Sequence, residues 1–90
     1  MAESVETRIQ HVLDSGDCAA VHDVLTEGYA SALQLDSERL ELERRITGLA
    51  ARADDPSTAQ ELRRAWLRHR TVSGELRQLR GLLRRLKTLA

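Results

Sequence analysis

The 90-residue sequence has almost no aromatic residues, because it contains no phenylalanine, one tryptophan (Trp66) and one tyrosine (Tyr29). A hydrophobic core must therefore consist of leucine, valine, isoleucine and alanine, with few large anchoring side chains. The single cysteine, Cys18, excludes an internal disulfide and is typical of a reducing compartment. No uninterrupted run of about 20 apolar residues is present, which excludes a transmembrane helix. The acidic start of the chain also lacks the apolar core of a signal peptide. We therefore expect a cytoplasmic protein.

The residue patterns of common catalytic and ligand sites are also missing. The five glycines are isolated from one another, so the sequence has no glycine-rich phosphate loop. It has no His-x-x-x-His or Glu-x-x-His pair and no second cysteine, so we predict no metal site. We expect no cofactor, no catalytic residues and no enzyme activity, and no motif identifies a protein family.

Two mainly apolar rows match each other in mirror order around a turn. The first row is Val21, Leu25, Gly28, Ala32, Leu35, Arg39, Leu42, Ile46 and Leu49, and the second is Leu62, Ala65, His69, Val72, Leu76, Leu79, Leu83, Leu86 and Ala90. Steps of three and four alternate in both rows, which places each row on one face of a helix. The residue numbers that face each other sum to 111 throughout. This pattern predicts an all-α fold in which two long helices form an antiparallel, coiled-coil-like hairpin.

Capping and helix-breaking residues predict where these helices begin and end. We expect one helical domain over residues 1–90, with helices at about 4–14, 18–53 and 57–89 and a turn at 54–56. Gly16 can take the left-handed conformation that ends the first helix, and Ser15 or Asp17 can cap the second. Pro56 suits the first turn of the third helix behind an Asp55 cap. Each long helix would span about 50 Å, which predicts a rod.

The charges balance over the whole chain but are separated along it. Residues 1–43 carry ten acids and two bases, whereas residues 44–90 carry four acids and twelve bases. An antiparallel arrangement would lay the acidic arm along the basic arm, and this attraction favours that register. A net charge of zero and the scarcity of aromatic residues argue against nucleic-acid binding.

Two polar residues interrupt the apolar rows. Arg39 faces Val72 in the mirror register, and we expect its guanidinium group to reach outward to an acid while its aliphatic stem packs. The three candidate acids are Glu38, Glu43 and Glu75. His69 faces Leu42, and we expect its imidazole to be partly buried.

Large apolar residues lie beside the rows, where the short first helix cannot reach them. Such a patch is typical of a protein contact, and a second copy of the chain is the simplest partner that would bury it. We therefore expect a homodimer with a four-helix core. The residues that we predict to self-associate are Leu33, Leu40, Trp66 and Leu67, with Arg45 and Arg68 as charge partners.

Arg45 and Arg68 are predicted as charge partners because the mirror register places like charges next to each other. It sets Glu38 beside Glu75 and Arg45 beside Arg68, which is unfavourable. Exchange of these charges with a second copy would relieve the repulsion, and so would diagonal contacts or screening by water within one chain. The sequence is compatible with either arrangement.

The sequence predicts a non-catalytic protein–protein interaction module, a small scaffold, adaptor or regulator that acts as a homodimer. An alternative is a secretion- or assembly-type chaperone that holds a partner's amphipathic helix on the same surface. A third hypothesis rests on an arginine stripe, Arg63, Arg70, Arg77 and Arg84, which recurs every seven residues. Such a stripe could bind phosphates or another anionic partner.

Overall fold

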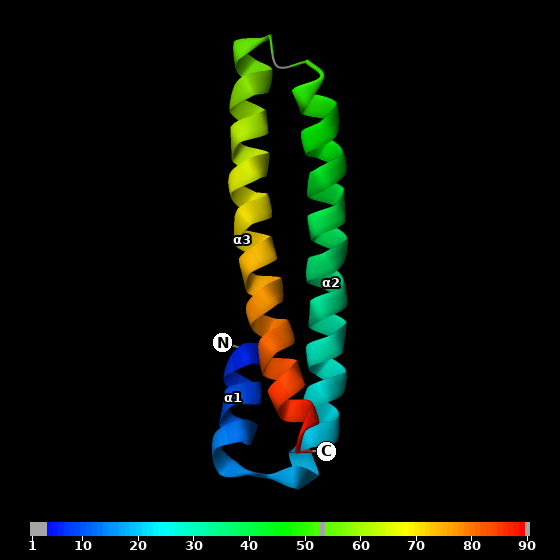
Figure 1. The fold of residues 1–90 in the computed structure, drawn as a ribbon, viewed down its shortest axis with the longest axis vertical. Coiled ribbons are helices and arrows are strands. Elements are labelled where there is room, and N and C mark those ends of the chain that lie inside the picture. Colours follow the sequence, from blue (N-terminus) through cyan, green and yellow to red (C-terminus); the bar gives the residue numbers. More distant parts are fainter. Residues whose placement is uncertain (1–3, 53, 90) are drawn as a thin grey trace.

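The chain is all-α: in a computed structural model, the described residues, 4–52 and 54–89, form three helices and no strand (Figure 1). The helices are α1 (Val5–Ser15), α2 (Cys18–Ala50) and α3 (Pro56–Lys87). Ala53, the predicted end of the second helix, and Ala90, the last member of the second row, lie outside the described residues. None of the three helices is long and apolar enough to cross a membrane within the described ranges.

The ends of the helices are set by the capping residues that the sequence indicates. Gly16 has a positive φ of 69° and ends α1 by donating its N–H to the carbonyl of Val12 at 2.9 Å. The carboxylate of Asp17 caps α2 by accepting from the N–H of Ala19 at 3.1 Å. Asp55 caps α3, with Pro56 as the first helical residue. These three caps are confirmed.

The two long helices lie side by side and run in opposite directions, and α1 packs beside them at the end that is distant from the turn (Figure 1). The molecule measures 55 × 22 × 17 Å, with a radius of gyration of 17.0 Å. A compact chain of this length would have a radius of gyration of about 12 Å. The protein is therefore a rod, as its helix lengths predict.

The hydrophobic core is divided into two clusters along the rod. The larger cluster joins all three helices and consists of Ile9, Val12, Val21, Val24, Leu79, Leu83 and Leu86. The smaller cluster lies near the turn and has only Ile46, Leu49 and Ala65 as buried members. Because α1 has 11 residues and spans only about 16 Å, it cannot reach the smaller cluster. The half of the rod near the turn is therefore only two helices thick.

Gly28 and Leu83 show how closely α2 and α3 approach in the larger cluster. A Cβ atom added to Gly28 would clash with Cδ2 of Leu83 and would lie 3.4 Å from Cδ1 of Ile9. Both neighbouring side chains are buried, so neither can swing out to solvent. The two residues belong to facing positions of the mirrored rows, and their contact is the one that this register requires.

Charged side chains pair between helices, and one of these pairs joins the acidic arm to the basic arm. Glu38 of α2 accepts from Nε of Arg68 on α3 at 2.8 Å. Arg8 of α1 is paired with Glu27 of α2. These side chains are all partly solvent-exposed, so the pairs favour the arrangement without contributing much stability.

Candidate functional site

α1 packs on one flank of the α2–α3 pair, in the half of the rod that is distant from the turn, and leaves the other flank open (Figure 1). On the covered flank, Val5 of α1 lines a groove together with Gln34 and Glu38 of α2. The open flank is defined by two stripes with helical spacing of three and four residues. These are Tyr29, Leu33, Asp36, Leu40 and Glu43 on α2, and Trp66, His69, Ser73, Arg77, Arg80 and Arg84 on α3.

Four large apolar side chains of the open flank face solvent. The exposed fractions are 50% for Tyr29, 69% for Leu33, 43% for Leu40 and 54% for Trp66. Three of them belong to the predicted self-association set, and Tyr29 joins them because it lies four residues before Leu33 on the same helix face. Exposed apolar side chains that gather on one side of a small protein are typical of interaction surfaces.

The open flank is hollowed near its α1 end. A cavity of about 330 Å³ lies between the two long helices and is lined mainly by apolar side chains. Its walls are Tyr29, Ala32, Leu33 and Leu83, with Asp36, Arg80 and Arg84 at its edge. An apolar hollow with a few charged groups at the rim is the usual form of a binding pocket.

A group of charged side chains lies in the middle of the open flank. Arg39 donates to a carboxylate oxygen of Asp36 from Nη2 at 2.7 Å and from Nε at 3.2 Å. Its Nη1 donates to Glu43 at 3.2 Å. The hydrogen bond to Asp36 is the largest cause of the raised pKa of Arg39. On the α3 side, Nη2 of Arg80 lies 3.7 Å from Asp36.

The partners of Arg39 differ in part from the sequence prediction. Glu43 is one of the three expected acids, but Asp36 takes the place of Glu38 and Glu75. Asp36 and Glu43 lie three residues before and four residues after Arg39 on the same helix, so both carboxylates flank its guanidinium group.

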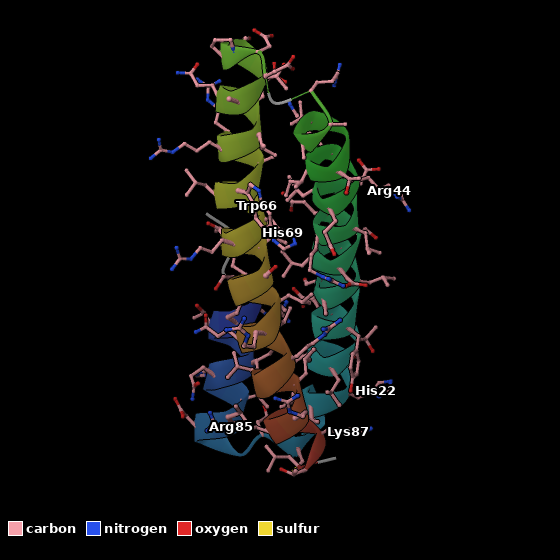
Figure 2. The ribbon with its side chains drawn as sticks, turned by 45° about the horizontal axis from the view of Figure 1, so that its top comes forward. His22, Arg44, Trp66, His69, Arg85 and Lys87 are labelled. Atoms are coloured by element: carbon pink, nitrogen blue, oxygen red, sulfur yellow. The ribbon has the colours of Figure 1, made fainter. Side chains whose placement is uncertain are left out.

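His69 is partly buried, as predicted, with 21% of its side chain exposed. Its ring meets the edge of the Trp66 ring, with centroids 5.8 Å apart and an angle of 81° between the planes. Figure 2 shows the two rings close together on α3. The Nε2 atom of His69 has no hydrogen-bond partner and lies 3.7 Å from a carboxylate oxygen of Glu43.

The other predicted self-association residues lie away from the open flank. Leu67 is 57% exposed, but its side chain points about 100° away from that of its neighbour Trp66. Arg45 and Arg68 line a separate groove with Leu42 and Ala65. The structure therefore divides the predicted set between two surfaces.

One of the two predicted charge partners, Arg68, has an acidic partner within its own chain. The hydrogen bond between Arg68 and Glu38 raises the pKa of Arg68, and the nearby charge of Glu75 raises it further. This is a diagonal contact within one chain, the second of the two arrangements that the sequence allows. Arg68 is thus already engaged with acids of its own chain.

The predicted arginine stripe is also divided by the structure. Arg77 and Arg84 line a groove of about 420 Å³ on the open flank, together with Arg39, Ser73, Leu76 and Arg80. Arg63 and Arg70 are exposed but do not line this groove. Among the described residues, no group of three or more His, Cys, Asp or Glu side chains could hold a metal ion. Cys18 is exposed.

Comparisons with known proteins add nothing to this geometry, since no family model, curated protein or solved structure matches the chain. The open flank is the surface that combines exposed apolar residues, an apolar cavity and a charged centre. Function is therefore inferred from the chemistry of that flank.

Proposed function

We propose that this chain is a non-catalytic protein–protein interaction module that acts as a homodimer through its open flank. The observation that carries the proposal is the exposure of Tyr29, Leu33, Leu40 and Trp66 on one side of the molecule. A second pair of long helices on this flank would give a four-helix, coiled-coil-like core. It would also thicken the half of the rod near the turn, where α1 does not reach.

The spacing of features along the open flank supports a second copy as the occupant. Trp66 lies about 25 Å along α3 from Leu83, which lines the apolar cavity. A two-fold axis near Ser73, midway between them, would place Trp66 of each copy against the cavity of the other. Such a self-complementary contact is what a two-fold dimer requires.

The charged residues of the open flank would also be complementary about the same two-fold axis. Glu43 lies on one side of Arg39 along α2, and Arg77 and Arg80 lie on the other side along α3. Rotation about the axis would bring Glu43 of each copy close to Arg77 and Arg80 of the second copy. Opposite charges that meet in this way fix the register of an interface. Leu67, Arg45 and Arg68 take no part in this interface.

Replacing Trp66 by alanine should dissociate the homodimer. Tryptophan side chains that fill a pocket contribute most to binding, so we expect the dissociation constant to rise at least about 30-fold. Molar mass measured by light scattering over a range of concentrations should show twice 10.1 kDa for the wild type and a monomer for Trp66→Ala. The emission of Trp66 should shift to shorter wavelength as the wild type associates.

Leu67→Ala is the matched control, because Leu67 is the next residue and has the same exposure within a few per cent. Its side chain points away from the open flank, so this variant should keep the mass of the wild type. A wild-type protein that is monomeric at all concentrations would contradict the homodimer. Equal dissociation of the two variants would contradict the choice of flank.

The apolar cavity also favours a second function, a chaperone that holds a partner's amphipathic helix on the open flank. A volume of about 330 Å³ can take the larger side chains of such a helix. This function requires the open flank to stay uncovered in the isolated protein. A chaperone should therefore remain monomeric and bind a hydrophobic dye, whereas the homodimer should bind little dye because its apolar face is covered.

A further inference from the structure

Four arginine side chains converge on one groove of the open flank. The groove has a volume of about 420 Å³ and is lined by Arg39, Ser73, Leu76, Arg77, Arg80 and Arg84. No acidic side chain lines it. Successive arginines at positions 77, 80 and 84 lie three and four residues apart, so their side chains leave the same face of α3.

Two of these four arginines have no counter-charge. Arg39 is paired with Asp36 and Glu43, and Arg80 lies 3.7 Å from Asp36. Arg77 and Arg84 make no ion pair with any carboxylate in residues 4–52 and 54–89. They are separated by about 10.5 Å along the helix, a distance that two arginine side chains can close around one ligand. The groove therefore carries an excess of positive charge.

Ser73 adds an unused hydrogen-bond donor to the wall of this groove. Its hydroxyl is buried and has no hydrogen-bond partner. Ser73 lies four residues before Arg77, on the same side of α3. Leaving a buried hydroxyl unpaired is unfavourable. A ligand oxygen that accepts a hydrogen bond from the Ser73 hydroxyl would remove this cost and so bind more tightly.

We propose that this groove binds the phosphate group of a small phosphorylated molecule. Guanidinium groups match the geometry of phosphate oxygens and hold them through paired, charge-assisted hydrogen bonds. Arg77 and Arg84 supply the uncompensated charge, and Arg80 and Ser73 supply further donors. The site lies within one chain and goes beyond the proposed self-association. It is open only in the monomer, because the proposed homodimer would cover the same flank and place Trp66 of the second copy in the neighbouring cavity.

The neighbouring cavity specifies the rest of the ligand. Arg80 and Arg84 line both the groove and the apolar cavity formed by Tyr29, Ala32, Leu33 and Leu83. A ligand whose phosphate lies in the groove would therefore place its adjoining atoms against apolar walls. The ligand class is a phosphate monoester with an apolar or aromatic group.

A long nucleic acid fits this surface less well. Its phosphates would follow the whole arginine stripe, yet Arg63 and Arg70 lie outside the groove. The carboxylates of Asp36 and Glu43 lie beside the groove and would repel an extended polyanion. The positive charge is concentrated at one concave place, which suits a single phosphate group.

The test is a titration of the monomer with phenyl phosphate at low ionic strength, followed by amide NMR shifts and calorimetry, with Trp66→Ala as the common background of all variants so that self-association cannot cover the groove. We expect saturable binding of roughly millimolar affinity, tighter than that of inorganic phosphate, with shifts at residues of the groove and cavity. Arg77→Ala/Arg84→Ala should weaken the affinity at least about 10-fold. Arg63→Ala/Arg70→Ala removes the same charge from the same stripe outside the groove and should change the affinity less than about twofold.

Two further variants separate phosphate binding in the groove from fold stability and from self-association. Ser73→Ala should weaken phenyl phosphate binding without lowering the denaturation midpoint, because it removes a donor that is unpaired in the free protein. Trp66→Ala should bind phenyl phosphate more tightly than the wild type if the homodimer forms, because it uncovers the groove, and equally tightly if the wild type is a monomer. A failure of the proposed homodimer therefore leaves this test intact. Equal losses in the two double-arginine variants would overturn the proposal, and so would the absence of saturable binding. A DNA duplex that binds more tightly than phenyl phosphate would also overturn it.

Discussion

Replacing Gly28 by alanine should destabilise the protein, although alanine is the better helix former. The added methyl group would clash with Leu83 and press on Ile9, and both side chains are buried in the cluster that joins the three helices. Overpacking of this kind costs about 1–3 kcal/mol, against a gain of about 1 kcal/mol in helix propensity. We expect a net loss of up to about 2 kcal/mol, visible as a fall of up to roughly 15 °C in the melting temperature.

Gly48→Ala and Gly74→Ala are matched controls, because nothing lies within 4 Å of a Cβ atom added at either position. Both should raise the stability by about 0.5–1 kcal/mol. Leu83→Val removes the atom that clashes, so Gly28→Ala should cost much less in that background. If Gly28→Ala instead behaves like the two controls, α2 and α3 do not meet in the register of the facing rows.

Replacing Leu79 by alanine should destabilise the protein more severely still. Leu79 is 0% exposed and belongs to the cluster that α1, α2 and α3 share. Truncation of a buried leucine costs about 2–5 kcal/mol, because it leaves a cavity as well as losing apolar contact. A 90-residue domain has a stability of about 5–13 kcal/mol, so the variant should lose a large share of its stability and melt at least roughly 10 °C below the wild type.

Leu33→Ala is the control for this prediction, because Leu33 is 69% exposed and loses little on truncation. Chemical denaturation followed by circular dichroism should show a free energy of unfolding within about 0.5 kcal/mol of the wild type, measured at a concentration where the chain is monomeric. A loss below about 1 kcal/mol for Leu79→Ala would mean that the shared cluster does not hold the three helices together.

The caps and the rod shape could be predicted because they depend on local chemistry. Gly16 ends α1 through a backbone conformation that glycine adopts at little cost, and Asp17 and Asp55 cap helices through their own carboxylates. The lengths of α2 and α3 follow from the interval between these signals. None of these features requires knowledge of what lies across the molecule.

The candidate site could be predicted only in part. The spacing of Leu33, Leu40 and Trp66 beside the apolar rows indicated an exposed surface, but the sequence did not show that Leu67 points elsewhere. Nor did it show that Arg77 and Arg84 share a groove with Arg39 while Arg63 does not. These distinctions depend on the angular position of each side chain once two helices are packed.

The helical fold, the helix caps and the separation of acidic and basic arms follow from the sequence alone, because each depends on the order of residues along one chain. Tertiary packing decided which flank α1 covers and that Arg68 finds Glu38 within its own chain. Glu38 and Glu75 both lie near Arg68, and only the packing of α2 against α3 makes Glu38 its hydrogen-bond partner. The same packing leaves one flank of the rod open, and the proposed functions rest on that flank.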